Sequence, residues 1–139
     1  MRNVATTLRF HTRGSGLLEI TEEVRAWQQS HPVGTGLLTL FCRHTSASLL
    51  VQENAARAVR ADLERFFAAI APEDPSRYEH NDEGSDDMPA HLRTALTDVN
   101  LSIPVIDGRM ALGTWQGIYL FEHRHGPHYR DVALHLLGE

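Results

Sequence analysis

The stretch TGLLTLFCR, residues 35–43, decides the fold class of this chain. Leu38, Leu40 and Cys42 alternate with their neighbours, so they lie on one face of an extended segment. An apolar run of this length bounded by turn residues predicts a core strand. His44 continues the same face, so the strand carries an imidazole to its end.

Further strands are predicted on both sides of this segment, and helices lie between them. Residues 4–12 alternate upstream, and the chain after residue 100 repeats strand-like runs with turns at Asp107-Gly108 and Gly126-Pro127. The expected downstream strands are 101–106, 110–112, 118–123 and 129–137. Strands at both ends with helices in the middle predict an α+β fold with an antiparallel sheet.

Three helices are expected. A short one begins at Thr21, which is placed to cap it, and another runs from Asp86 or Asp87 to Thr97. The clearest covers 54–70, where apolar residues recur at helical spacing. This predicted buried stripe consists of Val59, Leu63, Phe66, Phe67 and Ile70.

Length and composition exclude several classes of protein. The 139 residues, 42% of them hydrophobic, suit one domain over 1–139. A net charge of −5 without a basic stripe argues against nucleic-acid binding, and no apolar run is long enough to cross a membrane. With Cys42 as the single cysteine and no signal peptide in view, a cytoplasmic location is expected.

The polar segment 78–91 is the first candidate site. Asp87 and His91 stand four residues apart, so on a helix they share a face, and His80 lies in the loop before them. Imidazole with carboxylate suits a divalent metal ion. The alternative is that Asp87 only caps the helix and His80 is exposed.

Two further segments offer polar groups to a ligand. His44 is followed by small hydroxyl residues including Ser46, a combination able to hold a metal or an oxyanion, although a partly buried structural histidine explains it equally. Trp115 and Gln116 lie between glycines, where they either line a pocket or form a turn with a core tryptophan. The histidines at 123, 125 and 128 span a turn, and we do not expect a metal there.

Glu122 is the carboxylate whose predicted position is the most informative about its role. In the predicted strand it shares a face with Ile118 and Leu120, and a charge on an apolar face is costly without a partner. It is therefore either functional or held in a salt bridge, for which the candidates are Arg109, Arg124 and Arg130. No serine-hydrolase elbow, Walker loop or dinucleotide fingerprint is present.

Three segments together resemble a known family. They are HTSAS (44–48) with QEN (52–54), YEHN (78–81) with SDDMPAH (85–91), and GR (108–109) with LGTWQGIYL (112–120) and Glu122. On these segments the chain is similar to the YjbQ-like family, also called secondary thiamine-phosphate synthases. The resemblance implies a jelly-roll-like antiparallel β-sandwich with two to three helices packed on it, assembled as a homotrimer. It also implies a weak transferase activity that joins an aminopyrimidine diphosphate to a thiazole phosphate.

The resemblance and the residue chemistry together give a set of expected roles. A divalent ion, Zn²⁺ or Mg²⁺, is expected on His44, His80, Asp87 and His91. The expected catalytic carboxylates are Glu53, Asp62 and Glu122. The expected contacts to a phosphorylated substrate are Ser46, Arg109, Trp115, Gln116 and Arg130. The alternative function is a non-catalytic binding protein for a metal ion or a phosphorylated small molecule.

Overall fold

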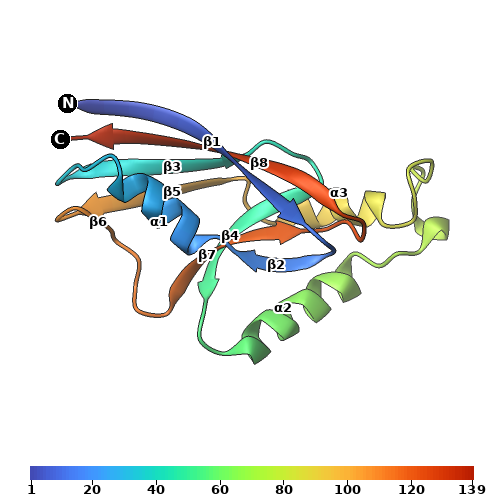
Figure 1. Ribbon diagram of the computed structural model, residues 1–139. Helices are drawn as coiled ribbons and strands as arrows, with labels where there is room; N and C mark the ends of the chain where they lie inside the picture. The colour runs from blue at the N-terminus through green and yellow to red at the C-terminus, as the bar shows by residue number, and fades with distance from the viewer.

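The computed structural model describes residues 1–139 and has an α+β architecture with two antiparallel sheets (Figure 1). The larger sheet has the strand order β1-β8-β3-β5-β6. In that order its strands are Arg2–Thr12, His128–Gly138, Gly36–Cys42, Asn100–Ile106 and Arg109–Met110. The predicted fold class is confirmed, and β1, β3, β5 and β8 lie where the alternation placed them.

The smaller sheet has the order β2-β7-β4, with strands Gly16–Glu19, Gln116–Glu122 and Ala47–Glu53. Strands β2 and β4 were not predicted. The small polar residues at 45–48 look like a loop in sequence, but Ala47 and Ser48 are fully buried against β7. The register pairs Ala47 with Glu122 at one end of β4 and Glu53 with Gln116 at the other.

The core lies between the two sheets and matches the pattern of residues 35–43. Leu38 and Leu40 have no exposed surface, and they pair in register with Leu136 and Leu134 of β8. One continuous apolar cluster also takes in Leu49 and other residues of the smaller sheet. Burial of these aliphatic side chains holds the two sheets together.

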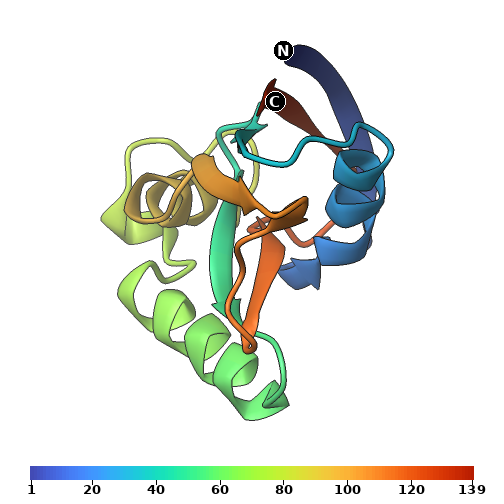
Figure 2. The same ribbon diagram turned by 90° about the vertical axis from the view of Figure 1, so that its left-hand side faces the viewer.

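The three helices are α1 (Thr21–Gln29), α2 (Arg57–Ile70) and α3 (Asp87–Leu96), with a 3₁₀ turn at Pro75–Arg77. Figure 2 shows α1 on the side of the sheets away from α2 and α3. Thr21 does not cap α1. Its hydroxyl instead donates to Glu19 and accepts from the backbone N–H of Ile118, which ties the helix to β7.

Helix α2 departs most from expectation. It begins at Arg57 rather than at residue 54, and its predicted buried stripe contains no buried residue. Phe66 and Ile70 are 56% and 48% exposed, because the four-residue strand β2 offers little surface for the helix to cover. Phe67 alone of the stripe makes an aromatic contact to the sheet, with Phe121 at a ring distance of 5.5 Å. No helix has the length and apolarity needed to cross a membrane.

Candidate metal centre

The loop before α3 and its first two turns bring four potential metal ligands together. His80, Glu83, Asp87 and His91 each offer one ligand atom, and these atoms lie within 4.8 Å of one another. Asp87 and His91 meet because they are one helical turn apart on α3. His80 and Glu83 are delivered by the loop, which folds back over the start of the helix.

One carboxylate oxygen is the centre of the cluster. Oδ2 of Asp87 lies 2.7 Å from Nε2 of His80 and 3.1 Å from Nε2 of His91. His80 Nε2 is also 3.1 Å from Oε2 of Glu83. The hydrogen bond to Asp87 raises the pKa of His80 above its ordinary value. Burial acts to raise the pKa of Asp87, but His80, His91 and Arg124 together lower it.

The guanidinium of Arg124 fixes Asp87 from the other side. Its Nη1 donates to Oδ1 of Asp87 at 2.7 Å, and its Nε donates to Asp86 at 3.0 Å. Only 5% of the Asp87 side chain is exposed. Arg124 therefore occupies one carboxylate oxygen and leaves the other to face the two histidines.

The protonation of His91 follows from its second nitrogen. Nδ1 lies 2.9 Å from the backbone carbonyl of Thr45, which can only accept, so Nδ1 carries the proton. In the neutral ring Nε2 is then an acceptor that faces another acceptor, Oδ2 of Asp87. Two lone pairs at this separation need a proton or a metal cation between them. A carbonyl on the outer nitrogen is the usual way in which metal-binding histidines are oriented.

The cluster fits a divalent cation with tolerance for nitrogen ligands. Zinc–ligand bonds of about 2.0–2.1 Å put neighbouring tetrahedral donors about 3.3 Å apart. Of the six separations among the ligand atoms of His80, Glu83, Asp87 and His91, two are 3.1 Å and one is 2.7 Å, and all lie within 4.8 Å. Mg²⁺ prefers an all-oxygen shell, so the two imidazoles favour Zn²⁺.

His44, expected as a fourth ligand, is not part of this cluster. Its Nε2 accepts a hydrogen bond of 2.8 Å from the backbone N–H of Asp131. Burial, and then the charge of Arg130, lowers the pKa of His44, so the ring is held neutral in this role. Glu83 takes the fourth position instead. Residues 80, 83, 87 and 91 are spaced as on one face of a helix, which would place Glu83 beside the other three. Residues 80–86 are not helical, however, and it is the path of the loop that brings them together.

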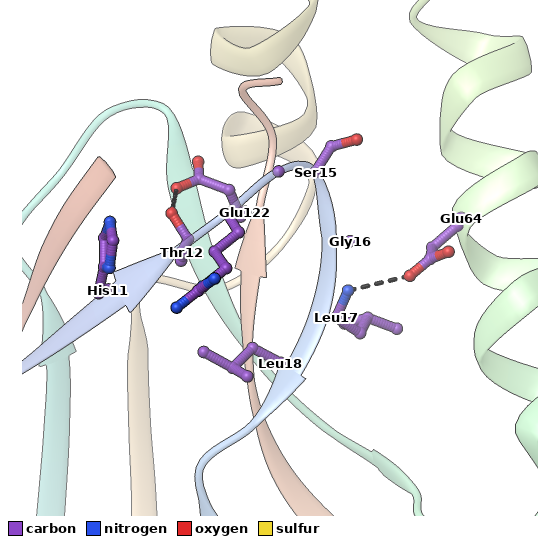
Figure 3. Close-up of a pocket in the computed structure, with 10 residues that line it drawn as sticks. His11, Thr12, Ser15, Gly16, Leu17, Leu18, Glu64 and Glu122 are labelled. Atoms are coloured by element: carbon purple, nitrogen blue, oxygen red, sulfur yellow. Dashed lines mark hydrogen bonds between the residues drawn. The ribbon is translucent and has the colours of Figure 1, made fainter. Parts of the chain in front are cut away.

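Glu122 takes the salt bridge that the sequence left open, and its partner is Arg130. Arg130 donates from Nε at 2.8 Å and from Nη2. Thr12 donates from its hydroxyl, as Figure 3 shows. The backbone N–H groups of His123 and Arg124 complete the shell. Burial would raise the pKa of Glu122, but these donors lower it. A carboxylate surrounded in this way links β7 to β1 and β8, and the structure gives it no free oxygen for catalysis.

The other two expected catalytic carboxylates have local partners. Glu53 accepts from the N–H groups of Ala55 and Ala56, so it supports the turn that leads into α2. Asp62 lies on the exposed side of α2 and pairs with Arg65. Neither residue faces the histidine cluster.

Ser46 and His44 line a cavity of about 620 Å³ that contains none of the four cluster residues in its wall. Thr45 lies in the same wall, and its carbonyl is the group that orients His91. The backbone carbonyl of Ser46 accepts from Arg130, so the guanidinium of Arg130 is occupied by Glu122 and Ser46 rather than free for a phosphate.

The remaining expected substrate contacts lie elsewhere. Arg109 belongs to β6, which Figure 1 places at the opposite end of the molecule from α3. Gln116 accepts from the N–H of Gly113 at 2.8 Å and closes a turn. Trp115 is 62% exposed, so the alternative of a core tryptophan is wrong. Within one chain these three residues do not converge with the histidine cluster.

Comparison with known proteins agrees with the fold and its long-range contacts. The family model described as UPF0047 protein YjbQ-like matches residues 6–139. The UPF0047 protein sll1880 of Synechocystis is 49% identical, with the match covering 100% of this chain and 99% of that protein. The YjbQ protein of Salmonella typhimurium is 47% identical over 96% of this chain and 95% of its own.

Solved structures give the same result. The crystal structure of the conserved hypothetical protein TT1486 from Thermus thermophilus superposes with a TM-score of 0.83 at 37% identity, covering 95% of this chain and 99% of that one. A protein from Aeropyrum pernix gives a TM-score of 0.83 at 32% identity, with full coverage of both chains. Sequence, fold and coverage agree along the whole chain, which therefore belongs to the UPF0047 (YjbQ-like) family.

Proposed function

We propose that the protein binds one Zn²⁺ ion through His80, Asp87 and His91, with Glu83 as the fourth ligand, and that the bound ion helps to hold a phosphorylated small molecule. The observation that carries this proposal is the distance of 3.1 Å between Nε2 of His91 and Oδ2 of Asp87, in a ring whose Nδ1 contacts the carbonyl of Thr45, so that in the neutral ring the two atoms are both acceptors. Thr45 fixes the ring of His91 and Arg124 fixes the carboxylate of Asp87, and a cation between these two acceptors would bind both of them.

The substrate would lie in the cavity lined by His44 and Ser46, next to Thr45 and His91. A zinc ion bound to Nε2 of His91 would lie across the imidazole ring from this cavity, whose wall contacts Nδ1 through Thr45, and its positive charge would act on phosphate oxygens from there. The chain itself contributes the alignment: Thr45 fixes one imidazole, and Arg124 fixes the shared carboxylate.

Within this proposal, the finer function is the transferase activity implied by the resemblance. In that reaction the thiazole nitrogen forms a bond to the pyrimidine methylene carbon while the bond from that carbon to the diphosphate oxygen breaks. Neutralisation of the departing diphosphate by a cation is the assistance that this step requires. The second candidate is a non-catalytic carrier. It is favoured by the three carboxylates expected to be catalytic, because Glu53, Asp62 and Glu122 each already bond to other protein groups.

Zinc titration of the metal-free protein tests the metal site. We expect one ion per chain, and His91→Gln should weaken zinc binding by about a hundredfold or more, which is the scale on which loss of one ligand acts. His135→Gln is the matched control, because His135 is exposed on β8 and its one side-chain hydrogen bond is to Asn3. Equal zinc affinity in the two variants would exclude this centre.

The zinc-loaded protein then separates the two candidates. An enzyme should release diphosphate and form thiamine phosphate when both half-molecules are present, and His91→Gln should lose this activity. A carrier should bind the phosphorylated half-molecules in calorimetry without turnover.

We also propose that the chain assembles as a homotrimer. Half-exposed Phe66 and Ile70 on α2, and Phe41 and Leu37 on β3, leave apolar surface that a monomer would expose to water. Light scattering should give about three times the chain mass of 15.6 kDa. A monomer at micromolar concentration would reject the proposal.

A further inference from the structure

Arg93 is a buried cation without a counter-ion. It lies on α3 and is 8% exposed, and its one hydrogen bond runs from Nη2 to the carbonyl of Ala71, at 2.7 Å. Its Nε is buried and has no partner, and no carboxylate oxygen lies within 4.0 Å of the guanidinium. A buried charge left in this state costs several kcal/mol unless a partner completes it.

Arg93 lines a cavity of about 330 Å³ between α2, α3 and the end of β7. This volume lies in the range of roughly 300–1,000 Å³ that is usual for small-molecule sites. It adjoins a second cavity of about 430 Å³, shown in Figure 3, and the two share Ser15, Gly16, Glu64 and Glu122. Arg93 and His91 are two residues apart on α3, so they project to different sides and this cavity is separate from the metal centre.

The other charged groups of the cavity are already paired. Glu122 is neutralised by Arg130, and Glu64 accepts from the N–H of Leu17. Glu73 contacts His125, and Arg65 pairs with Asp62. Arg93 is therefore the one buried charge in this cavity that bonds to no side chain, since Glu64, which also bonds only to backbone, is exposed. Phe67 and Phe121 give another part of the cavity wall an apolar, aromatic character.

We propose that this cavity binds a small organic anion, whose carboxylate or phosphate group pairs with Arg93 and whose apolar part lies against Phe67. The guanidinium supplies planar donors matched to either anionic group. The site differs from the zinc centre in residues and in chemistry, because it recognises negative charge without a metal ion.

Titration of ¹⁵N-labelled protein with sodium benzoate tests the proposal, with sodium phosphate as a second probe and sodium chloride at matched ionic strength as the blank. We expect saturable shifts of the Arg93 Nε–H signal and of the backbone amides of Phe67 and His125. Benzoate that binds more tightly than phosphate would identify the apolar wall as part of the site. The absence of saturation with both probes would overturn the proposal.

Variants then assign the binding to this cavity. Arg93→Lys should weaken it roughly ten- to hundredfold, the scale of a charge-assisted hydrogen bond, while Arg77→Lys on the 3₁₀ turn should have no effect. Ala68→Leu fills the cavity from the exposed surface of α2 and leaves Arg93 in place, so it should abolish binding with the fold intact. Unchanged binding in Arg93→Lys or in Ala68→Leu would overturn the assignment.

Discussion

Two carboxylates of this molecule have opposite surroundings although both are buried beside basic groups. Every oxygen of Glu122 receives hydrogen-bond donors, from Arg130, Thr12 and two backbone N–H groups. Asp87 receives donors from Arg124 on one oxygen, and its other oxygen faces two imidazole nitrogens. The hydrogen bonds of Glu122 neutralise both of its oxygens, whereas Oδ2 of Asp87 needs a proton or a cation between it and the imidazole nitrogens. The difference separates a structural ion pair from the group of side chains at which we propose a metal ion.

The largest effect should come from Glu122→Gln. This substitution leaves Arg130 buried, only 5% of its side chain being exposed, without a counter-ion, and breaking one partner of such a pair costs about 3–5 kcal/mol. Urea unfolding measures the loss. Zinc affinity of the folded variant should be unchanged.

Asp62→Asn is the matched control for that experiment. Its partner Arg65 and Asp62 itself are about 70% exposed, so the loss should stay below about 1 kcal/mol. A Glu122→Gln protein with native stability and no activity would instead restore Glu122 as a catalytic group.

A second prediction concerns the histidine next to Glu122. Burial lowers the pKa of His123 to about 3, so the folded state keeps the ring neutral while the unfolded chain protonates it near 6.5. The unfolded state then binds more protons below pH 6.5, and stability must fall as the pH falls. Between pH 7 and pH 5 this one group should remove about 2 kcal/mol.

The comparison of wild type with His123→Gln isolates the contribution of His123 to the pH dependence of stability. Glu122 has a lowered pKa, so its contribution is present above its ordinary value of 4.5 and is lost only as the pH falls further. His80 has a raised pKa, and its contribution is lost as the pH rises through that value, equally in both proteins. Parallel pH profiles for wild type and His123→Gln would show that folding does not lower the pKa of His123.

The smallest effect tests the alignment of Asp87. Arg124→Lys keeps the positive charge but loses the planar fork that holds Asp86 and Asp87 together. Zinc affinity should fall about tenfold, the lower end of what outer contacts contribute to metal sites. Arg109→Lys, at the far end of the molecule, serves as control. An unchanged affinity in Arg124→Lys would mean that Asp87 is fixed by the helix alone.

The expected zinc ligands illustrate what local pattern can and cannot predict. The helix at 87–96 and the pairing of Asp87 with His91 follow from a spacing of four residues. His44 looked equivalent to them in sequence, but the N–H of Asp131, 87 residues away, takes its nitrogen. Glu83 entered the cluster through a loop whose path has no periodic signal.

The helix at 57–70 illustrates the same limit for packing. Its apolar residues do lie on one face of a helix, and its conformation was predictable because helical spacing is a local property. Burial depends on what lies opposite, and the short strand β2 covers little of the stripe. The start of strand β4 was missed for the converse reason, because Ser48, a small polar residue, is buried by the pairing of β4 with β7 rather than by its own hydrophobicity.

The sequence by itself determined the strand alternation, the helix at 87–96, the family and the side of that helix on which Asp87 and His91 meet. The tertiary structure alone decided which polar groups find partners. It joined Glu122 to Arg130 across the two sheets, oriented His91 through Thr45, and left Arg93 without a counter-ion. The physical reason is that periodicity depends on backbone geometry within one element, whereas the completion of a buried charge depends on side chains from strands and helices distant in the chain.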